Sequence, residues 1–173
     1  RPIMVVEVLE GLDIRAGGVY FDGTAGGGGH SFAILAADPT VRLVATDKDG
    51  DAIREVTERL SPFAGRYKLY RTDFKNFASV LDDAGVEKLD GYLLDLGISS
   101  HQIDTRERGF AYMSDDAPLD MRMDDRAQLT AKEVVNGYSE EALLRILREY
   151  GEESYASSIV RNIVRERAKG EIA

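Results

Sequence analysis

Short hydrophobic runs alternate with segments of helical spacing along the first hundred residues of the chain. Compact apolar runs bounded by turn-forming residues are typical of buried strands, whereas apolar positions three and four apart are typical of helices. This pattern predicts strands at residues 19–24, 42–47, 67–73 and 90–96, and helices at residues 4–12, 31–37, 51–60 and 74–84. Strands that alternate with helices at this spacing predict βαβ units and a parallel α/β sheet.

The pattern changes after the fourth expected strand. Residues 98–129 are polar and charged with little periodicity, which predicts a long loop of the functional or disordered kind. From Thr130 the spacing is helical, with Glu133 completing a capping box, a second cap at Ser139 and a last helix over residues 152–169. Four strands followed only by helices form an incomplete sheet, so we expect the remaining strands beyond Ala173.

The run VYFDGTAGGGGH, residues 19–30, reads as a strand, an acid, a glycine turn and a helix start. Each glycine costs ~0.5–1 kcal/mol relative to alanine in a regular element, so Gly26–Gly29 do not serve helix or strand stability. Glycines let the backbone approach another group closely. At the carboxyl end of the first strand of an open α/β sheet, that group is usually a nucleotide-like cofactor.

All four expected strands end in or near an acidic residue, namely Asp22, Asp47, Asp73 and Asp95. An acid about 20 residues after the glycine turn is placed to bind ribose hydroxyls, which predicts that role for Asp47. Asp73 and Phe74 together could hold an adenine, and Asp95 is expected near the reacting end of the cofactor. Simpler roles stay open: helix caps for Asp47 and Asp73, core packing for Phe74.

Two cofactors compete for this site. A dinucleotide fold has the pattern G-x-G-x-x-G, whose third glycine allows close helix packing. Here Ser31 or Phe32 stands at that third position, depending on the register. The pattern Asp22-x-x-x-Gly26-x-Gly28 favours S-adenosylmethionine, and a dinucleotide-dependent reductase is the weaker alternative.

Composition narrows the function further. The 173 residues carry a net charge of −9 and no cysteine, which excludes thiolate metal sites, disulfides and a cysteine nucleophile in this chain. The charge argues against indiscriminate nucleic-acid binding. No apolar run approaches a membrane span and no secretory signal opens the chain, so we expect a cytoplasmic protein. The acids of residues 115–125 alternate with Arg122 and Arg126, which favours a salt-bridged loop over a metal site, and we predict no bound metal.

Five motifs, in order, resemble the ribosomal RNA small subunit methyltransferase H family, which methylates the exocyclic amine of one cytidine in 16S rRNA. They are DGTAGGGGHS (residues 22–31), LLDLGISSHQID (93–104), RGFAYM (108–113), PLDMRMD (118–124) and EYGEES (149–154). His101 departs from the family, where many members have proline. The chain also opens at Arg1-Pro2, without the histidine that commonly begins the family's first motif, so we expect residues to be missing upstream.

The resemblance implies a Rossmann-like methyltransferase sheet with a helical insertion. Residues 1–129 would be the N-terminal part of the methyltransferase domain, with an active-site loop at 98–129, and residues 130–173 the truncated start of the insertion. The predicted S-adenosylmethionine ligands are Gly26, Gly28, Gly29, His30, Asp47, Phe74, Asp95 and Gln102, and Asp95 is the candidate catalytic residue. His30 could instead only begin a helix.

The expected reaction is direct transfer of a methyl group to the N4 amine of a cytidine, without a covalent enzyme intermediate. The expected partner is 16S rRNA within the 30S subunit, and the oligomeric state is not predicted. Phe110 and Tyr112 could stack on a flipped base or anchor the loop. Two other readings stay open: a methyltransferase for a protein or small molecule, and a non-catalytic ribosome-assembly factor that keeps the fold.

Overall fold

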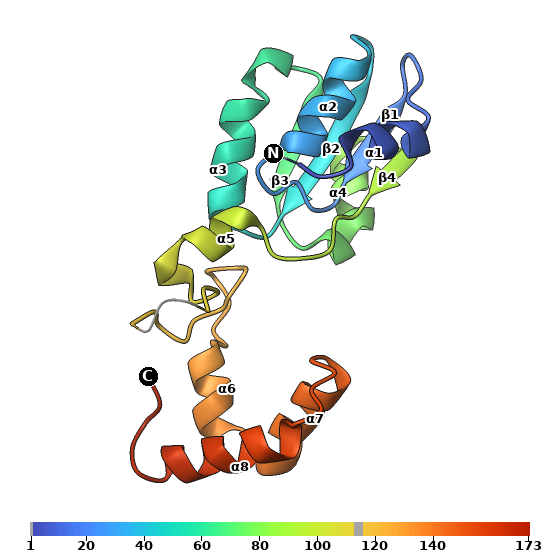
Figure 1. The fold of residues 1–173 in the computed structure, drawn as a ribbon. Helices are drawn as coiled ribbons and strands as arrows, with labels where there is room; N and C mark the ends of the chain where they lie inside the picture. The colour runs from blue at the N-terminus through green and yellow to red at the C-terminus, as the bar shows by residue number, and fades with distance from the viewer. Residues whose placement is uncertain (1, 113–115) are drawn as a thin grey trace. The chain divides into compact units, whose positions relative to one another are not determined.

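The computed structural model describes residues 2–112 and 116–173 and divides into two compact units, Arg1–Ser99 and Ser100–Ala173 (Figure 1). Arg1, Met113 and Asp115 figure in the sequence predictions but lie outside the described residues. Each unit has its own set of elements.

A parallel sheet of four strands forms the centre of the first unit. In sheet order the strands are β3 (Tyr67–Arg71), β2 (Arg42–Asp47), β1 (Val19–Asp22) and β4 (Gly91–Leu93). In the register, Tyr20 of β1 lies opposite Leu43 of β2 and Gly91 of β4. The predicted parallel α/β sheet is therefore confirmed for these four strands.

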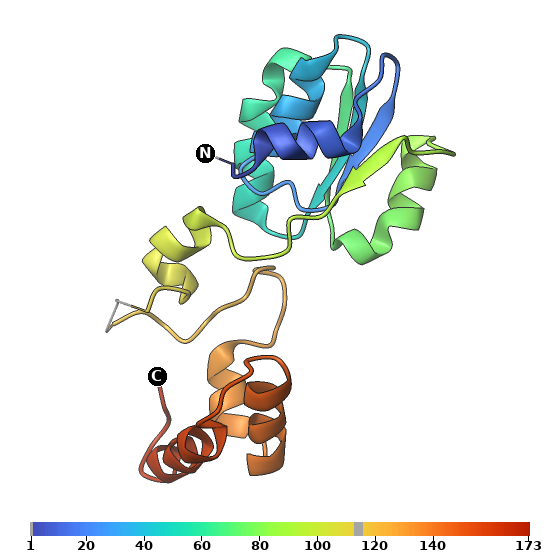
Figure 2. The same cartoon turned by 45° about the vertical axis from the view of Figure 1, so that its right-hand side comes forward.

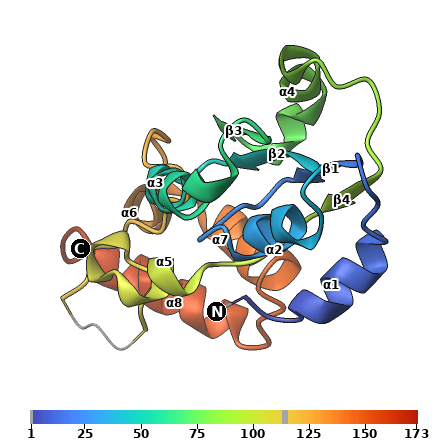
Figure 3. The same cartoon turned by 90° about the horizontal axis from the view of Figure 1, so that it is seen from above.

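Helices cover both faces of this sheet. Helices α1 (Val5–Leu12), α2 (Gly29–Ala37) and α3 (Gly50–Arg59) lie on one face, and α4 (Phe77–Ala84) lies on the other (Figures 2 and 3). Two short 3₁₀ helices, η1 (Ser61–Phe63) and η2 (Phe74–Asn76), connect the elements. Because only the β3–β4 connection crosses the second face, the strand order reverses direction between β1 and β4.

Alternation along the strands divides the core in two. Tyr20 points into a cluster with Ile34 and Leu35 of α2 and Val56 of α3. Its neighbour Phe21 points to the opposite face and packs with Val44 of β2 and Val80 of α4. The buried face of each helix thus fixes which side of β1 it covers.

Several predicted boundaries are wrong by a few residues. Helix α2 begins at Gly29 rather than residue 31, because Gly28 takes a left-handed φ of 73° and ends the preceding turn. Strands β1 and β4 stop at Asp22 and Leu93, where the chain leaves the sheet into loops. The helix expected at residues 74–84 is divided into η2 and α4.

The second unit consists of helices. They are α5 (Ser100–Asp104), η3 (Arg106–Arg108), α6 (Ala131–Gly137), α7 (Glu140–Glu149) and α8 (Ala156–Arg167). The capping box of Thr130 with Glu133 is present as predicted, and Ser139 accepts from the amide of Ala142. The expectation of a continuous loop over 98–129 is wrong at its start, because α5 and η3 occupy residues 100–108.

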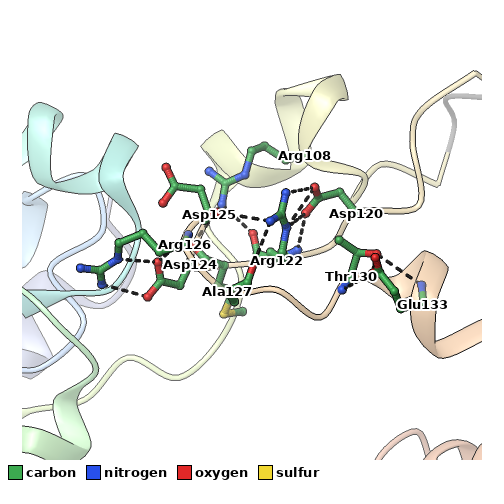
Figure 4. A network of polar contacts seen from close by, with 10 residues as sticks. Arg108, Asp120, Arg122, Asp124, Asp125, Arg126, Ala127, Thr130 and Glu133 are labelled. Carbon is green, nitrogen blue, oxygen red and sulfur yellow. Dashed lines mark hydrogen bonds and ion pairs between the residues drawn. The ribbon is translucent and has the colours of Figure 1, made fainter. Parts of the chain in front are cut away.

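Hydrogen bonds and ion pairs join η3 to residues 120–127 and hold these residues to one another (Figure 4). Arg108 donates to the carbonyl oxygens of Arg122 and Met123 at 2.9 and 3.2 Å. Arg122 pairs with Asp120 at 2.6 Å, and Arg126 pairs with Asp124 at 2.9 Å. This is the salt-bridged loop predicted from the alternating charges. Within residues 2–112 and 116–173, no group of three metal-binding side chains is found.

A buried carboxylate joins β1 to α2. Asp22 is fully buried, and it accepts a hydrogen bond from the Ser31 hydroxyl at 2.6 Å and another from the Thr24 amide at 3.1 Å. Burial raises the pKa of Asp22, and the two hydrogen bonds oppose that rise. A raised pKa in the folded state means that the contribution of Asp22 to stability is greatest in acid and declines as the pH rises through that pKa.

Substitution Ser31→Ala tests this arrangement. It removes the hydroxyl that favours the ionised form, so the pKa of Asp22 rises further. We expect a loss of about 1 kcal/mol of unfolding free energy in acid and about 1.5–3 kcal/mol at neutral to alkaline pH. Urea unfolding at several pH values measures the loss of unfolding free energy in acid and at higher pH. The control is Ser79→Ala, which removes an exposed hydroxyl on α4. An equal loss at every pH would contradict the role assigned to Asp22.

Candidate functional site

The carboxyl ends of the four strands meet at one edge of the sheet because all four run in parallel. In open α/β sheets, ligands bind at this edge where the strand order reverses. Here the reversal lies between β1 and β4, so the loops after Asp22 and after Leu93 face one another. Most of the predicted site residues lie in these loops or in the loops that follow β2 and β3.

The glycine loop after β1 is hydrogen-bonded to the strands on both sides. The Gly23 amide donates to the Leu93 carbonyl of β4 at 2.9 Å, and the Ala25 amide donates to the Thr46 carbonyl of β2 at 3.0 Å. The Thr46 hydroxyl in turn donates to the Gly23 carbonyl at 3.0 Å. The loop is therefore fixed by the sheet before any ligand binds.

The glycines of the run serve different purposes. Gly26 and Gly28 have φ of 51° and 73°, a left-handed backbone that disfavours side chains. A Cβ on Gly29 would lie 2.6 Å from Cγ of Pro2, so the start of α2 is packed against the N-terminal segment. A Cβ on Gly27 would meet Oε1 of Glu55 at 2.9 Å. Part of the run thus allows close packing within the protein itself, which the sequence did not distinguish from ligand approach.

Asp47 ties the end of β2 to the glycine loop. One carboxylate oxygen accepts from the Gly26 amide at 2.8 Å, and the other accepts from the Asp49 amide at 2.9 Å. The N-cap of α3 is Asp49, so Asp47 is not the helix cap. Burial raises the pKa of Asp47, and both amides oppose that rise. A carboxylate has about four acceptor positions, so two amides leave capacity for two hydroxyl groups.

The end of β3 presents an aromatic ring. Phe74 lines an apolar cavity of about 400 Å³ together with Phe21, Phe77 and Leu94. Asp73 accepts from the Lys75 amide at 3.0 Å and caps η2, which favours the capping role for this residue. Phe74 also packs against the Phe21 core, so both of its predicted roles stay open.

Asp95 follows β4 and faces the start of α2. Its backbone amide donates to the Thr24 hydroxyl at 2.7 Å, and its side chain is 51% exposed. One of its carboxylate oxygens, Oδ2, lies 3.9 Å from Nδ1 of His30. Thr24 was missed by the sequence analysis, although a hydroxyl residue beside a glycine turn was a usable signal.

The first unit therefore brings seven of the eight predicted ligand residues to one edge of its sheet. Gln102 lies in α5 of the second unit and is buried, and its role stays a prediction. The edge offers a preformed glycine loop, a half-buried acceptor, an aromatic wall and a half-exposed carboxylate. These groups suit an elongated ligand with a sugar, a flat ring and a polar reacting end.

None of the helices in residues 2–112 and 116–173 combines the length and the apolar character that crossing a membrane requires.

A solved structure described as an rRNA methylase from Streptococcus thermophilus is 19% identical in sequence to this chain. The match covers 56% of this chain and 55% of the methylase chain, with a TM-score of 0.44. That likeness is too weak to bear on fold or function.

Similarity to curated proteins is much stronger. Ribosomal RNA small subunit methyltransferase H 2 of Agathobacter rectalis is 50% identical over 167 residues, 96% of this chain and 53% of the relative. Ribosomal RNA small subunit methyltransferase H of Symbiobacterium thermophilum is 49% identical over 167 residues, 96% of this chain and 52% of the relative. The chain spans about half the length of these relatives. Because the model of the MraW methylase family matches residues 1–173, the chain belongs to that family.

Proposed function

We propose that the protein transfers a methyl group from S-adenosylmethionine to the exocyclic N4 amine of a cytidine in 16S rRNA. The observation that carries this proposal is the convergence of the glycine loop, Asp47 and Asp95 at the reversal point of a parallel sheet. Family membership and the names of the relatives support a methyltransferase of small-subunit ribosomal RNA.

The residues at the sheet edge fit the methyl donor. Asp47 has acceptor capacity for the two ribose hydroxyls, and the left-handed turn at Gly26 and Gly28 keeps side chains out of the cradle. Phe74 offers a ring face for adenine. His30 and Asp95 lie 3.9 Å apart beside the glycine loop, and we assign them to the reacting end of the cofactor. When bound, S-adenosylmethionine supplies a methyl group on a positively charged sulfur.

The chain's own contribution to the reaction is alignment. Asp95 is exposed enough to reach a substrate, and its carboxylate can accept a hydrogen bond from the cytosine amine, directing the nitrogen lone pair at the methyl carbon. Holding the two reactants in line contributes several kcal/mol, ~7–11 at best. Asp95 is therefore assigned the substrate-facing role and Asp47 the cofactor-facing role.

The substrate we favour is the assembled 30S subunit rather than free RNA, and the site of action is the cytoplasm. A net charge of −9 on these 173 residues disfavours non-specific attraction to RNA phosphates. A structured particle provides recognition by shape, which does not depend on a strongly basic surface.

Substitution Asp47→Asn tests the cofactor site. The amide nitrogen of asparagine cannot accept from the Gly26 amide, and the charge that would bind ribose hydroxyls is lost. Hydrogen bonds to charged groups contribute about 1.5–3 kcal/mol, so we expect affinity for S-adenosylmethionine to fall about 10- to 150-fold. Isothermal titration calorimetry on the protein at the length of its relatives measures this.

The matched control for this variant is Asp82→Asn, an exposed acid on α4. It makes the same chemical change away from the sheet edge and should leave affinity within about twofold. Unchanged affinity in Asp47→Asn would mean that Asp47 only anchors the glycine loop.

Methyl transfer itself is tested with labelled S-adenosylmethionine and the protein at the length of its relatives. Unmethylated 30S subunits, free 16S rRNA and bulk protein are offered in parallel, and the RNA is digested to nucleosides. We expect label in N4-methylcytidine from the 30S sample. Label in protein would overturn the substrate, and cofactor binding without any transfer would support a non-catalytic assembly factor.

A further inference from the structure

The imidazole of His30 lies between two acceptors in the first unit. Its Nε2 lies 2.9 Å from the carbonyl oxygen of Ile3. A carbonyl oxygen can only accept, so Nε2 carries the hydrogen and donates it. In the neutral ring Nδ1 is then the bare nitrogen, and it faces the Asp95 carboxylate at 3.9 Å.

A bare nitrogen and a carboxylate oxygen that face one another are both acceptors. A proton on either atom would make the two a donor and an acceptor. The Asp95 backbone is fixed by its amide bond to Thr24, and His30 is fixed by Ile3, so the two acceptors are brought together by the fold. The buried carboxylate of Asp22 also interacts electrostatically with His30, and it already accepts hydrogen bonds from Ser31 and Thr24.

The two side chains of this pair differ in their exposure to solvent. The His30 side chain is 10% exposed, and the Asp95 side chain is 51% exposed. Asp95 is therefore the member that a substrate can reach, and His30 lies behind it, shielded from water. The separation of 3.9 Å exceeds a hydrogen bond, and such contacts in ligand-free sites commonly shorten when the substrate is bound.

We propose that His30 is a positioning residue that holds Asp95 as a proton acceptor and takes the proton on from it. This inference rests on the proposed function. After transfer, the methylated nitrogen carries one proton too many. Its N–H bond breaks, the electron pair stays on nitrogen, and an O–H bond forms on Asp95. That O–H bond then breaks as Nδ1 of His30 forms an N–H bond, leaving the Asp95 carboxylate beside an imidazolium.

The tautomer of His30 tests the geometry without any activity measurement. The ¹⁵N spectrum of the imidazoles is recorded on the protein at the length of its relatives, and the His30 signals are assigned as those that a His30→Gln variant lacks. At a pH where the rings are neutral, we expect His30 to carry its hydrogen on Nε2 with Nδ1 bare. A hydrogen on Nδ1 instead would overturn the proposal.

Two substitutions separate the proton role from the structural one. Glutamine places an amide near the Nε2 position, so His30→Gln keeps a donor for Ile3 and loses Nδ1. Asparagine places its amide near the Nδ1 position, so His30→Asn loses the bond to Ile3. Neither amide is basic. We expect kcat to fall at least about tenfold in both variants, part of the roughly 10²–10⁴-fold that a positioned base contributes. Only His30→Asn should also lower the Tm.

The measurements use the protein at the length of its relatives, with kcat, KM, cofactor affinity and Tm recorded for each variant. Asp82→Asn, the exposed acid on α4, is the control and should keep kcat within about twofold. Wild-type kcat in His30→Gln would overturn the inference, and so would a loss of cofactor affinity with kcat unchanged. If the wild-type protein itself transfers no methyl group, it is the proposed function that fails, while the tautomer still tests the geometry.

Discussion

Parallel pairing of β1 with β2 on one side and β4 on the other is the constraint on which the site depends. It places the ends of all four strands at one edge, and it forces the chain to cross to the opposite face between β3 and β4. The loops after β1 and β4 therefore lie beside one another at the carboxyl edge of the sheet. The glycine loop is hydrogen-bonded to Leu93 of β4 and to Thr46 of β2, on either side of β1, so its shape is set by the sheet.

Three carboxylates at this edge have the same chemistry and three different environments. Asp22 is fully buried and accepts hydrogen bonds from Ser31 and Thr24, so it joins β1 to α2 inside the protein. Asp47 is partly buried and accepts one hydrogen bond from each of two backbone amides. Asp95 is half exposed and is held by its backbone rather than its side chain. Of these three carboxylates, only Asp95 is exposed enough to contact the substrate group that loses a proton.

The sequence was sufficient to place the four strands along the chain and to predict that they are parallel, because hydrophobic periodicity and spacing depend on local chemistry. It was also sufficient to find the glycine loop and the acid at the end of β2. It could not show that Asp22 is fully buried and Asp95 half exposed, because burial is decided by packing between distant segments. The sequence also could not show that Gly29 is needed for packing against Pro2, whereas Gly26 and Gly28 are needed for a left-handed backbone, since the residue type is the same in both cases. Residues 100–108 were expected as loop because their helices are too short for periodicity to register.

The contact between Pro2 and Gly29 connects the glycine run to the proton site. Without a Cβ at Gly29, Pro2 packs directly on the start of α2, and Met4 then takes a left-handed φ of 54° as the chain turns into α1. That turn leaves the Ile3 carbonyl pointing at His30, which is the next residue after Gly29. A side chain at position 29 would displace Pro2 and with it the acceptor that determines the His30 tautomer. The last glycine of the run therefore acts on the chemistry of the site through the N-terminal segment, even though its own backbone lies at the start of a helix.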